Sequence, residues 1–381
     1  MSTDATEILA IDGGPPVRSA PFPERQIPDP AADDNPIESL EREFAAYVAL
    51  SPSTAIAVDS YEVACTLALA ALGITPSPGD EVVIPALRAS RLADALANAG
   101  LTLVPAEVEA DTANIGPRGL AKAIGERTHL VASVHAFGHP FIASDVGRVL
   151  DEHSLPLLED ASTGVGASYR FRPTGTLGSA AIFEFAPPHL ISAGGLGGAM
   201  LILQDEAEAA VARSRRDATG HLIDQAAARI ALAELRGAAD ELAIRRQLAW
   251  ELTFDLRARK SVTGMAHSRW VMHAYDSYVA RIRGLLWKRP LDDTVAALVA
   301  EGIPCEAAFQ PSLHFHPAVT GALADDPRIE PAGFPVASRL PNEAIAFPLH
   351  GAMTDREIAD IARALEKLEA ASTGTNTATS A

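Results

Sequence analysis

Short apolar runs alternate with amphipathic segments through the first 160 residues of the chain. The runs at 53–58, 81–85, 101–105, 127–135 and 155–158 have the length of buried strands. Most of the segments between them carry apolar residues at helical spacing, as Ile37, Leu40, Phe44 and Val48 do in the segment 36–49. This alternation of strands and helices indicates βαβ units and a mostly parallel sheet lying between helices, an α/β fold.

The second half of the chain predicts a different organisation. After strands at 180–185 and 201–203, the segment 225–257 predicts one long helical region, and from about residue 258 a smaller α+β unit begins. This unit contains a predicted strand at 273–279 and a predicted helix at 291–301. We therefore expect a large domain at 1–257, a small C-terminal domain at 258–370 and a disordered tail at 371–381, where Ser, Thr, Ala, Gly and Asn predominate.

Several polar residues follow predicted strands directly. Right-handed crossovers would place Ser60, Pro85, His135 and Asp160 along one edge of the sheet, where open α/β sheets bind ligands. His189 lies just beyond the next strand. A carboxylate at one strand end and a titratable residue after the next form the layout of a cofactor site.

Composition excludes several classes of partner. The formal net charge is −18, and no basic cluster is longer than Arg213–Arg216, which argues against nucleic acid and anionic membranes as partners. The chain has no apolar run of about 18 residues and no basic-then-apolar N-terminus. We expect a soluble, cytoplasmic protein whose two cysteines, Cys65 and Cys305, are reduced thiols.

Four motifs follow one another between residues 159 and 198. They are Glu159-Asp160-Ala161, Gly175 to Gly178, Glu184-Phe185 and Gly195 to Gly198. This order resembles E-D-A-x-Q, G-x-x-G, S-F-x-x-x-K and G-x-G-G of the DegT/DnrJ/EryC/StrS-type sugar and aminocyclitol aminotransferases, which use pyridoxal phosphate (PLP). The resemblance extends over about residues 8 to 368. It implies the type I PLP-aminotransferase fold, a homodimer, and a setting in amino-sugar or aminocyclitol biosynthesis.

The sequence departs from this family at the positions that contact the cofactor. His189 stands where the family has the lysine that forms the Schiff base, and the only lysines are Lys122, Lys260, Lys288 and Lys367. The remaining departures replace phosphate- or ring-binding residues: Tyr61-Glu62 for Gly-Thr, Ala89 for an aromatic residue, Thr163 for Gln, Glu184 for Ser, and Gly220 and Leu222 for the Asn and Arg that reach across the dimer.

These losses favour a chain that no longer binds PLP usefully, and two uses of such a fold are open. It is either a partner subunit, paired with itself or with an active relative, or a cofactor-free acid–base enzyme acting on a small keto sugar or cyclitol. The candidate residues for the second use are Glu62, Arg88, Asp160, Glu184 and His189. In the alternative without catalysis, Arg88 only neutralises the charge of Glu62 or Glu184 in a filled cleft.

A further alternative keeps the cofactor. The chain resembles the GDP-4-keto-6-deoxymannose 3-dehydratases in having His at the lysine position, and there the His acts as the base on PLP or its amino form, PMP. The resemblance then assigns cofactor contacts to Asp160, Ser60 and Thr163.

Three other histidines stay ambiguous from sequence. His135 either faces the active cleft or bonds a neighbouring loop as a structural residue. His314 and His316 have spacing that would suit a metal, but no third ligand stands nearby in sequence, so no metal site is expected.

Overall fold

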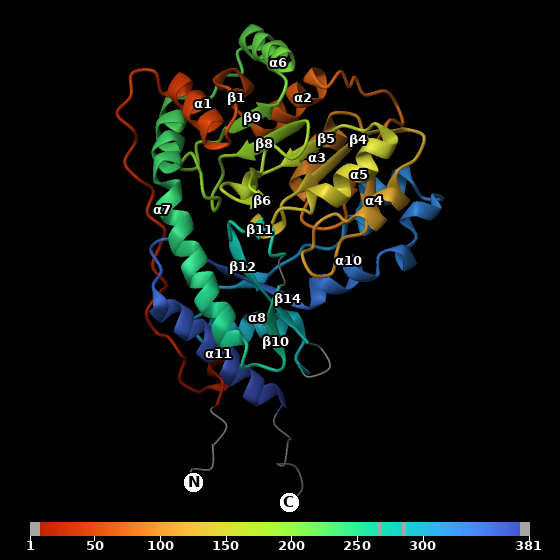
Figure 1. The fold of residues 1–381 in the computed structure, drawn as a ribbon. Coiled ribbons are helices and arrows are strands. Elements are labelled where there is room, and N and C mark those ends of the chain that lie inside the picture. The colour runs from red at the N-terminus through yellow and green to blue at the C-terminus, as the bar shows by residue number, and fades with distance from the viewer. Residues whose placement is uncertain (1–7, 266–267, 284–286, 374–381) are drawn as a thin grey trace, which may run out of the picture.

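The computed structural model describes residues 8–265, 268–283 and 287–373 (Figure 1). A seven-stranded sheet lies at its centre, in the order β1 (Ala55–Val58), β9 (Ala199–Leu203), β8 (Ala180–Glu184), β5 (Leu157–Asp160), β4 (Thr128–Val134), β2 (Glu81–Pro85) and β3 (Thr102–Ala106). Only β9 of this sheet runs antiparallel to its neighbours. The prediction of a mostly parallel sheet is therefore confirmed.

Helices cover both faces of this sheet because its strands are apolar on both sides. Ile56 and Val58 face one layer, made of α2 (Tyr61–Ala71), α3 (Ser90–Asn98) and α6 (Glu206–Thr219). Ala55 and Ala57 face the other layer, which contains α1 (Pro36–Tyr47) and α7 (Gln225–Leu256). Towards β3 that second layer is continued by α4 (Pro117–Ala123) and α5 (Ala143–His153). Continuous apolar strands of this kind are typical of parallel sheets buried on both faces.

The long helix α7 connects two hydrophobic cores (Figure 1). Its first half packs Leu232 and Leu235 against the large sheet, and its second half packs Leu248 and Leu252 against the C-terminal part of the chain. The carboxylate of Asp224 caps its N-terminus by accepting hydrogen bonds from the backbone N–H groups of residues 226 and 227, at 2.7 and 3.3 Å.

Replacing Asp224 with Ala is expected to lower the free energy of unfolding by about 1 kcal/mol, since two N-terminal donors of α7 lose their acceptor. Urea denaturation measures this change. Asp224→Asn is the matched control, because Asn is an equally good N-cap and should leave stability close to wild type. Equal losses in both variants would contradict a capping role.

A smaller antiparallel sheet forms the C-terminal part, in the order β10 (Val262–Gly264), β12 (Ser277–Ile282), β14 (Ala344–Pro348) and β13 (Glu306–Ala307). It packs with α8 (Leu291–Ala300) and α11 (Asp355–Thr373). The short helices α9 (Pro317–Ala322) and α10 (Pro335–Arg339) lie between β13 and β14 in the chain. A third sheet joins β11 (Val271–Met272), β6 (Ser168–Tyr169) and β7 (Arg172–Pro173).

The N-terminal segment 8–18 also packs against this C-terminal part. Leu9 lies in the same core as α8 and α11. The buried Glu301 carboxylate accepts hydrogen bonds from the backbone of Ala10 and Val17 and pairs with Lys367 at 2.9 Å. The domain boundary near residue 257 stays a prediction, but this leader contacts the unit on the far side of it.

Two local predictions were wrong. The strand expected at 273–279 begins only at Ser277, because Tyr275 adopts a left-handed backbone with φ of 52° and residues 273–276 form a loop. Residues 371–373, expected to belong to the tail, lie in α11, which continues to Thr373, and the remainder of the predicted tail, 374–381, lies outside the described residues. Within the described residues, no helix has the length and apolar character needed to cross a membrane. Both cysteines are free thiols, as predicted.

Candidate functional site

The carboxyl ends of the parallel strands meet at one edge of the large sheet, as the crossovers predicted. Asp160 ends β5 and Glu184 ends the neighbouring β8. Ser60 follows β1 and caps α2, its Oγ accepting a hydrogen bond from the backbone of Val63 at 3.4 Å. The side chains that extend from these ends define the candidate site.

Asp160 is engaged on both of its oxygens. Its Oδ2 accepts a hydrogen bond from the phenol of Tyr61 at 2.9 Å, and its Oδ1 accepts from the backbone N–H and hydroxyl of Ser162 at 3.1 and 2.6 Å. Tyr61 is only 1% exposed. Burial first, and then the charge of Asp160, hold the pKa of the Tyr61 phenol well above its usual range. Tyr61 is therefore a neutral donor to a carboxylate.

Arg91, in the first turn of α3, joins the two other carboxylates of the site. Its guanidinium pairs with Glu62 and with Glu184, the latter at 3.0 Å, and it lies 5.0 Å above the ring of Tyr61. The cation that neutralises these carboxylates is thus Arg91 and not Arg88, which was the predicted candidate. Arg88 has a left-handed backbone with φ of 63°, and its exposed side chain lies 4.4 Å over the ring of Phe137.

His189 pairs with a carboxylate from the C-terminal part of the chain. Its Nδ1 lies 3.2 Å from Oδ1 of Asp276, which is buried in the loop before β12. Burial lowers the pKa of His189, but Asp276, and after it Asp160 and Glu184, outweigh burial and raise this pKa overall. The carboxylates at the ends of β5 and β8 therefore lie close enough to His189 to raise its pKa.

A pocket of about 310 Å³ lies beside Asp276. Pro188, Arg25, Arg245 and His350 also line it, and His189 does not. Arg25 donates to the carbonyl of His189 at 3.0 Å and pairs with Glu234 at 3.1 Å. Arg245 is fully buried and pairs with Glu241 at 2.9 Å. Nδ1 of His350 is buried and has no hydrogen-bond partner among the residues that the structure describes.

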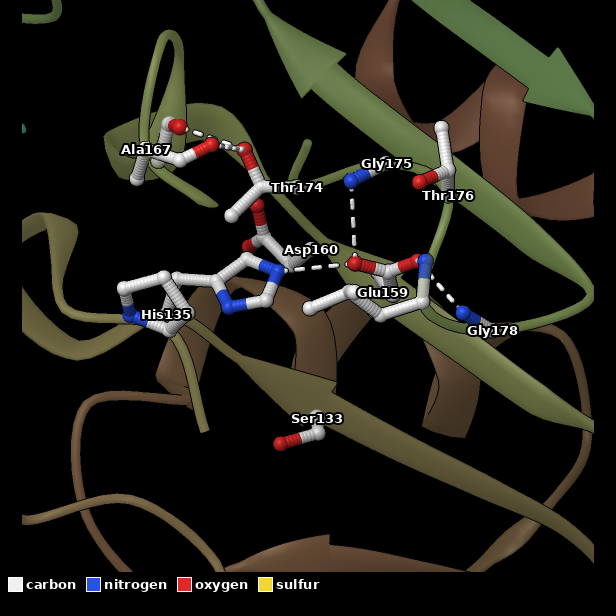
Figure 2. A network of polar contacts seen from close by, with 12 residues as sticks. Ser133, His135, Glu159, Asp160, Ala167, Thr174, Gly175, Thr176 and Gly178 are labelled. Carbon is white, nitrogen blue, oxygen red and sulfur yellow. Dashed lines mark hydrogen bonds and ion pairs between the residues drawn. The ribbon is translucent and has the colours of Figure 1, made fainter. Parts of the chain in front are cut away.

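His135 belongs to a separate buried network behind the strand ends (Figure 2). Its Nε2 lies 2.9 Å from Oε2 of Glu159, which also accepts a hydrogen bond from the backbone of Gly175 at 2.9 Å. Oε1 of Glu159 accepts from the backbone N–H groups of residues 177 and 178, each at 2.6 Å. His135 has no exposed surface and stacks on Phe141. This geometry supports the structural alternative for His135, which holds a loop rather than facing a ligand.

The other predicted residues make local contacts. Thr163 donates its hydroxyl to the carbonyl of His135. His314 is buried, and its two ring nitrogens lie 2.7 and 3.3 Å from the hydroxyls of Ser312 and Ser338, whereas His316 is exposed and accepts a backbone hydrogen bond at 3.3 Å.

Sequence reasoning missed the roles of three residues. The sequence presents Tyr61 only as a departure from the family motif, gives no role to Arg91, and predicts a strand at Asp276. For Arg91 a weak indication existed, since the first turn of a helix that follows a strand end points toward the shared edge. For Asp276 none existed, because its position depends on the left-handed turn at Tyr275.

Comparisons with known proteins agree over almost the whole chain. A model of the DegT/DnrJ/EryC1/StrS aminotransferase family matches residues 32–366. The erythromycin biosynthesis sensory transduction protein EryC1 of Saccharopolyspora erythraea is 29% identical over 335 residues, covering 85% of this chain and 87% of that protein. The L-glutamine:2-deoxy-scyllo-inosose aminotransferase of Streptoalloteichus tenebrarius is 29% identical over 421 residues, with 94% and 97% covered.

A solved structure extends this likeness to the fold. The crystal structure of DesI in the presence of its TDP-sugar product superposes with a TM-score of 0.81 at 24% identity, covering 96% of each chain. The predicted type I aminotransferase fold is therefore confirmed.

Proposed function

Because the chain belongs to the DegT/DnrJ/EryC1/StrS aminotransferase family, we propose that it acts on a keto sugar or keto-cyclitol, with His189 transferring a proton and without a resident PLP. The observation that carries this proposal is the ion pair of His189 with Asp276, a residue that lines a pocket of about 310 Å³. Pockets of a few hundred cubic ångströms suit small ligands. Relatives of the family supply the substrate class, since one is named for its action on 2-deoxy-scyllo-inosose.

The contact with Asp276 supports Nε2 as the reacting atom of His189. Nδ1 is held by Asp276, so Nε2 is the nitrogen that exchanges protons with a ligand. In the neutral form, Nε2 removes a proton from the carbon next to the ligand's carbonyl, and the electrons of the broken C–H bond move to the carbonyl oxygen as an enolate. Return of a proton from the imidazolium to carbon restores the ketone and the neutral imidazole, so the step balances without a co-reactant.

The pocket offers hydrogen bonds rather than excess charge. Arg25 and Arg245 are each paired with a carboxylate, so neither presents an uncompensated positive charge to a ligand. A pocket whose cations are already paired favours a neutral, polyhydroxylated ring such as a sugar or cyclitol over a highly charged ligand.

The side chains around Asp160 do not fit PLP as the family uses it. Position 189 has His and no amine to form a Schiff base. The oxygen of Asp160 that faces the site already accepts the phenol of Tyr61, and the start of α2, where the family binds the phosphate, presents the carboxylate of Glu62. This carboxylate is paired with Arg91, so it stands where a phosphate would need donors and it engages the nearby cation. These contacts support the cofactor-free form of the proposal.

A PLP- or PMP-dependent reaction with His189 as the base is the second candidate. Family membership favours it, since the match runs along nearly the whole chain and the relatives are described as aminotransferases. One solved relative at 18% identity, a putative sugar aminotransferase of Streptococcus pneumoniae, is described as a PLP form. In both candidates His189 performs the proton transfer, and the partner-subunit alternative differs from both in needing no chemistry at His189.

Titration of the purified protein with PLP and PMP separates the two candidates. Absorbance and thermal shift are measured with increasing cofactor. Saturable binding at micromolar cofactor supports the second candidate, and absence of binding at millimolar cofactor supports the first. The reaction itself is tested with 2-deoxy-scyllo-inosose in D₂O, where NMR follows the replacement of hydrogen by deuterium next to the carbonyl.

The pH dependence of this exchange is expected to depend on Asp276. A base acts in its neutral form, so the rate should rise with pH through the raised pKa of His189. Asp276→Asn removes the main group that raises this pKa, and the midpoint of the rise should move to lower pH. The exposed Asp151→Asn serves as the control and should leave the midpoint in place. An unchanged midpoint in Asp276→Asn would separate Asp276 from the reacting group.

A further inference from the structure

We propose that Tyr61 is a built-in occupant of the place where the cofactor ring binds in this family, and that Arg91 holds it there. The proposal concerns the binding of the ring and does not depend on any catalytic role of His189. Three features of Tyr61 carry it: its hydrogen bond, its stacking partner and its burial.

The hydrogen bond of Tyr61 goes to the carboxylate that the family resemblance assigns to the pyridine nitrogen. The phenol donates to Oδ2 of Asp160 at 2.9 Å, and the remaining oxygen is bonded by Ser162. A planar six-membered ring therefore presents a polar hydrogen to Asp160, as a protonated pyridine ring would. A buried carboxylate needs such donors, and here the chain itself supplies them.

The face of the Tyr61 ring is also covered. The guanidinium of Arg91 lies 5.0 Å from the ring centre, a geometry in which a cation is attracted to the ring face. At the neighbouring position 89, the family resemblance expects an aromatic residue that stacks on the cofactor, and this chain has Ala89. The chain thus lacks the aromatic residue that would stack on the cofactor, and it has Arg91, which stacks on Tyr61 instead.

Ion pairs fix Arg91 in this place. It contacts Glu62 and Glu184, which replace a phosphate-binding Thr and a Ser of the family motifs. Three departures from the family, at positions 61, 62 and 184, therefore meet at Arg91 in one connected group of contacts. Their connection indicates that they maintain a closed ring site together, since each contact requires the others in order to be satisfied.

Removing the ring should reopen the site. A buried aromatic side chain that is truncated leaves a cavity, and such cavities bind small aromatic molecules of matching shape. We therefore expect Tyr61→Gly to bind pyridoxal, which has the ring without the phosphate, and Tyr61→Gly with Glu62→Thr to bind PLP more tightly than the single variant does. Wild type and Tyr61→Phe, which keeps the ring and loses only the hydroxyl, should bind neither.

The experiment compares these four proteins by equilibrium dialysis and thermal shift with pyridoxal and PLP. Tyr61→Gly is expected to lower the Kd for pyridoxal at least about tenfold relative to wild type. Adding His189→Lys to the double variant should give a Schiff-base absorbance in the presence of PLP, and borohydride should fix the cofactor to residue 189, as mass spectrometry detects.

Saturable PLP binding by the wild-type protein at micromolar concentration overturns the proposal. This test needs no variant, so the proposal can be contradicted even if Tyr61→Gly does not fold. Pyridoxal binding by Tyr61→Phe equal to that by a folded Tyr61→Gly overturns it too. A folded Tyr61→Gly that binds neither compound does the same. PLP binding by wild type would also contradict the cofactor-free form of the proposed function. The pyridoxal results of the Tyr61 variants test this inference alone, and proton exchange tests the proposed function alone, so the two failures are distinguishable.

Discussion

Replacing His189 with Gln is expected to slow deuterium exchange next to the carbonyl of 2-deoxy-scyllo-inosose by about 10²–10⁴-fold, the usual contribution of a positioned general base. Gln retains hydrogen-bonding capacity toward Asp276 but cannot accept and return a proton near neutral pH. The effect should appear in the rate of exchange, with ligand binding in the pocket beside Asp276 largely retained. NMR measures the rate, and thermal shift measures the binding.

A matched control for His189→Gln is His153→Gln. His153 is exposed at the end of α5, so this change tests the loss of an imidazole without touching the site. We expect wild-type exchange and wild-type melting in this control. If His189→Gln retains the wild-type rate, His189 is not the base. If no variant and no wild-type protein catalyses exchange while dimers form normally, the partner-subunit alternative gains instead.

The positions of the strand ends were predictable from the sequence because they follow from regular hydrophobic patterns and from the handedness of the strand connections. Short apolar runs alternating with helical segments fix a mostly parallel sheet, and right-handed crossovers then bring the ends of β1, β4, β5 and β8 to one edge. Asp160 was found in this way, and Glu184 was found from its place in the family motif. His189 was found from its place in the family motif and lies in the field of both carboxylates.

The partners of these residues could not be predicted, because they depend on side-chain directions and on an irregular turn. Arg88 lies before α3 with a left-handed backbone and its guanidinium lies over the ring of Phe137, whereas Arg91, in the first turn of α3, bridges Glu62 and Glu184. Asp276 reaches His189 only because the chain turns at Tyr275. No periodic pattern reports such a turn.

Replacing Glu159 with Gln is expected to lower the free energy of unfolding by several kcal/mol, since each buried donor left without an acceptor costs about 1–3 kcal/mol. The fully buried carboxylate faces four donors: the ring of His135 and the backbone N–H groups of Gly175, Leu177 and Gly178 (Figure 2). Gln has one acceptor oxygen, and its amide nitrogen would point a donor at two of these donors.

The loop that Glu159 holds cannot readily adjust to the change. Gly175 has a left-handed backbone with φ of 87°, and a side-chain carbon at this position would lie 2.6 Å from the ring of Phe183. The loop therefore cannot move toward Phe183 to find other acceptors, and it leads directly into β8, which ends at Glu184. We expect the variant to lose stability and to loosen the strand end that positions one of the site carboxylates.

Urea denaturation of Glu159→Gln beside Glu152→Gln tests this expectation. Glu152 forms an exposed ion pair with Arg148 at 3.4 Å, so its replacement should change stability by no more than about 1 kcal/mol. Equal, small losses in the two variants would show that Glu159 can be neutralised without cost, and the network around His135 would then not be what holds this loop. A large loss only in Glu159→Gln would show that the Glu159 carboxylate stabilises the loop. The end of β5 would then supply both a stabilising carboxylate, Glu159, and a candidate site carboxylate, Asp160.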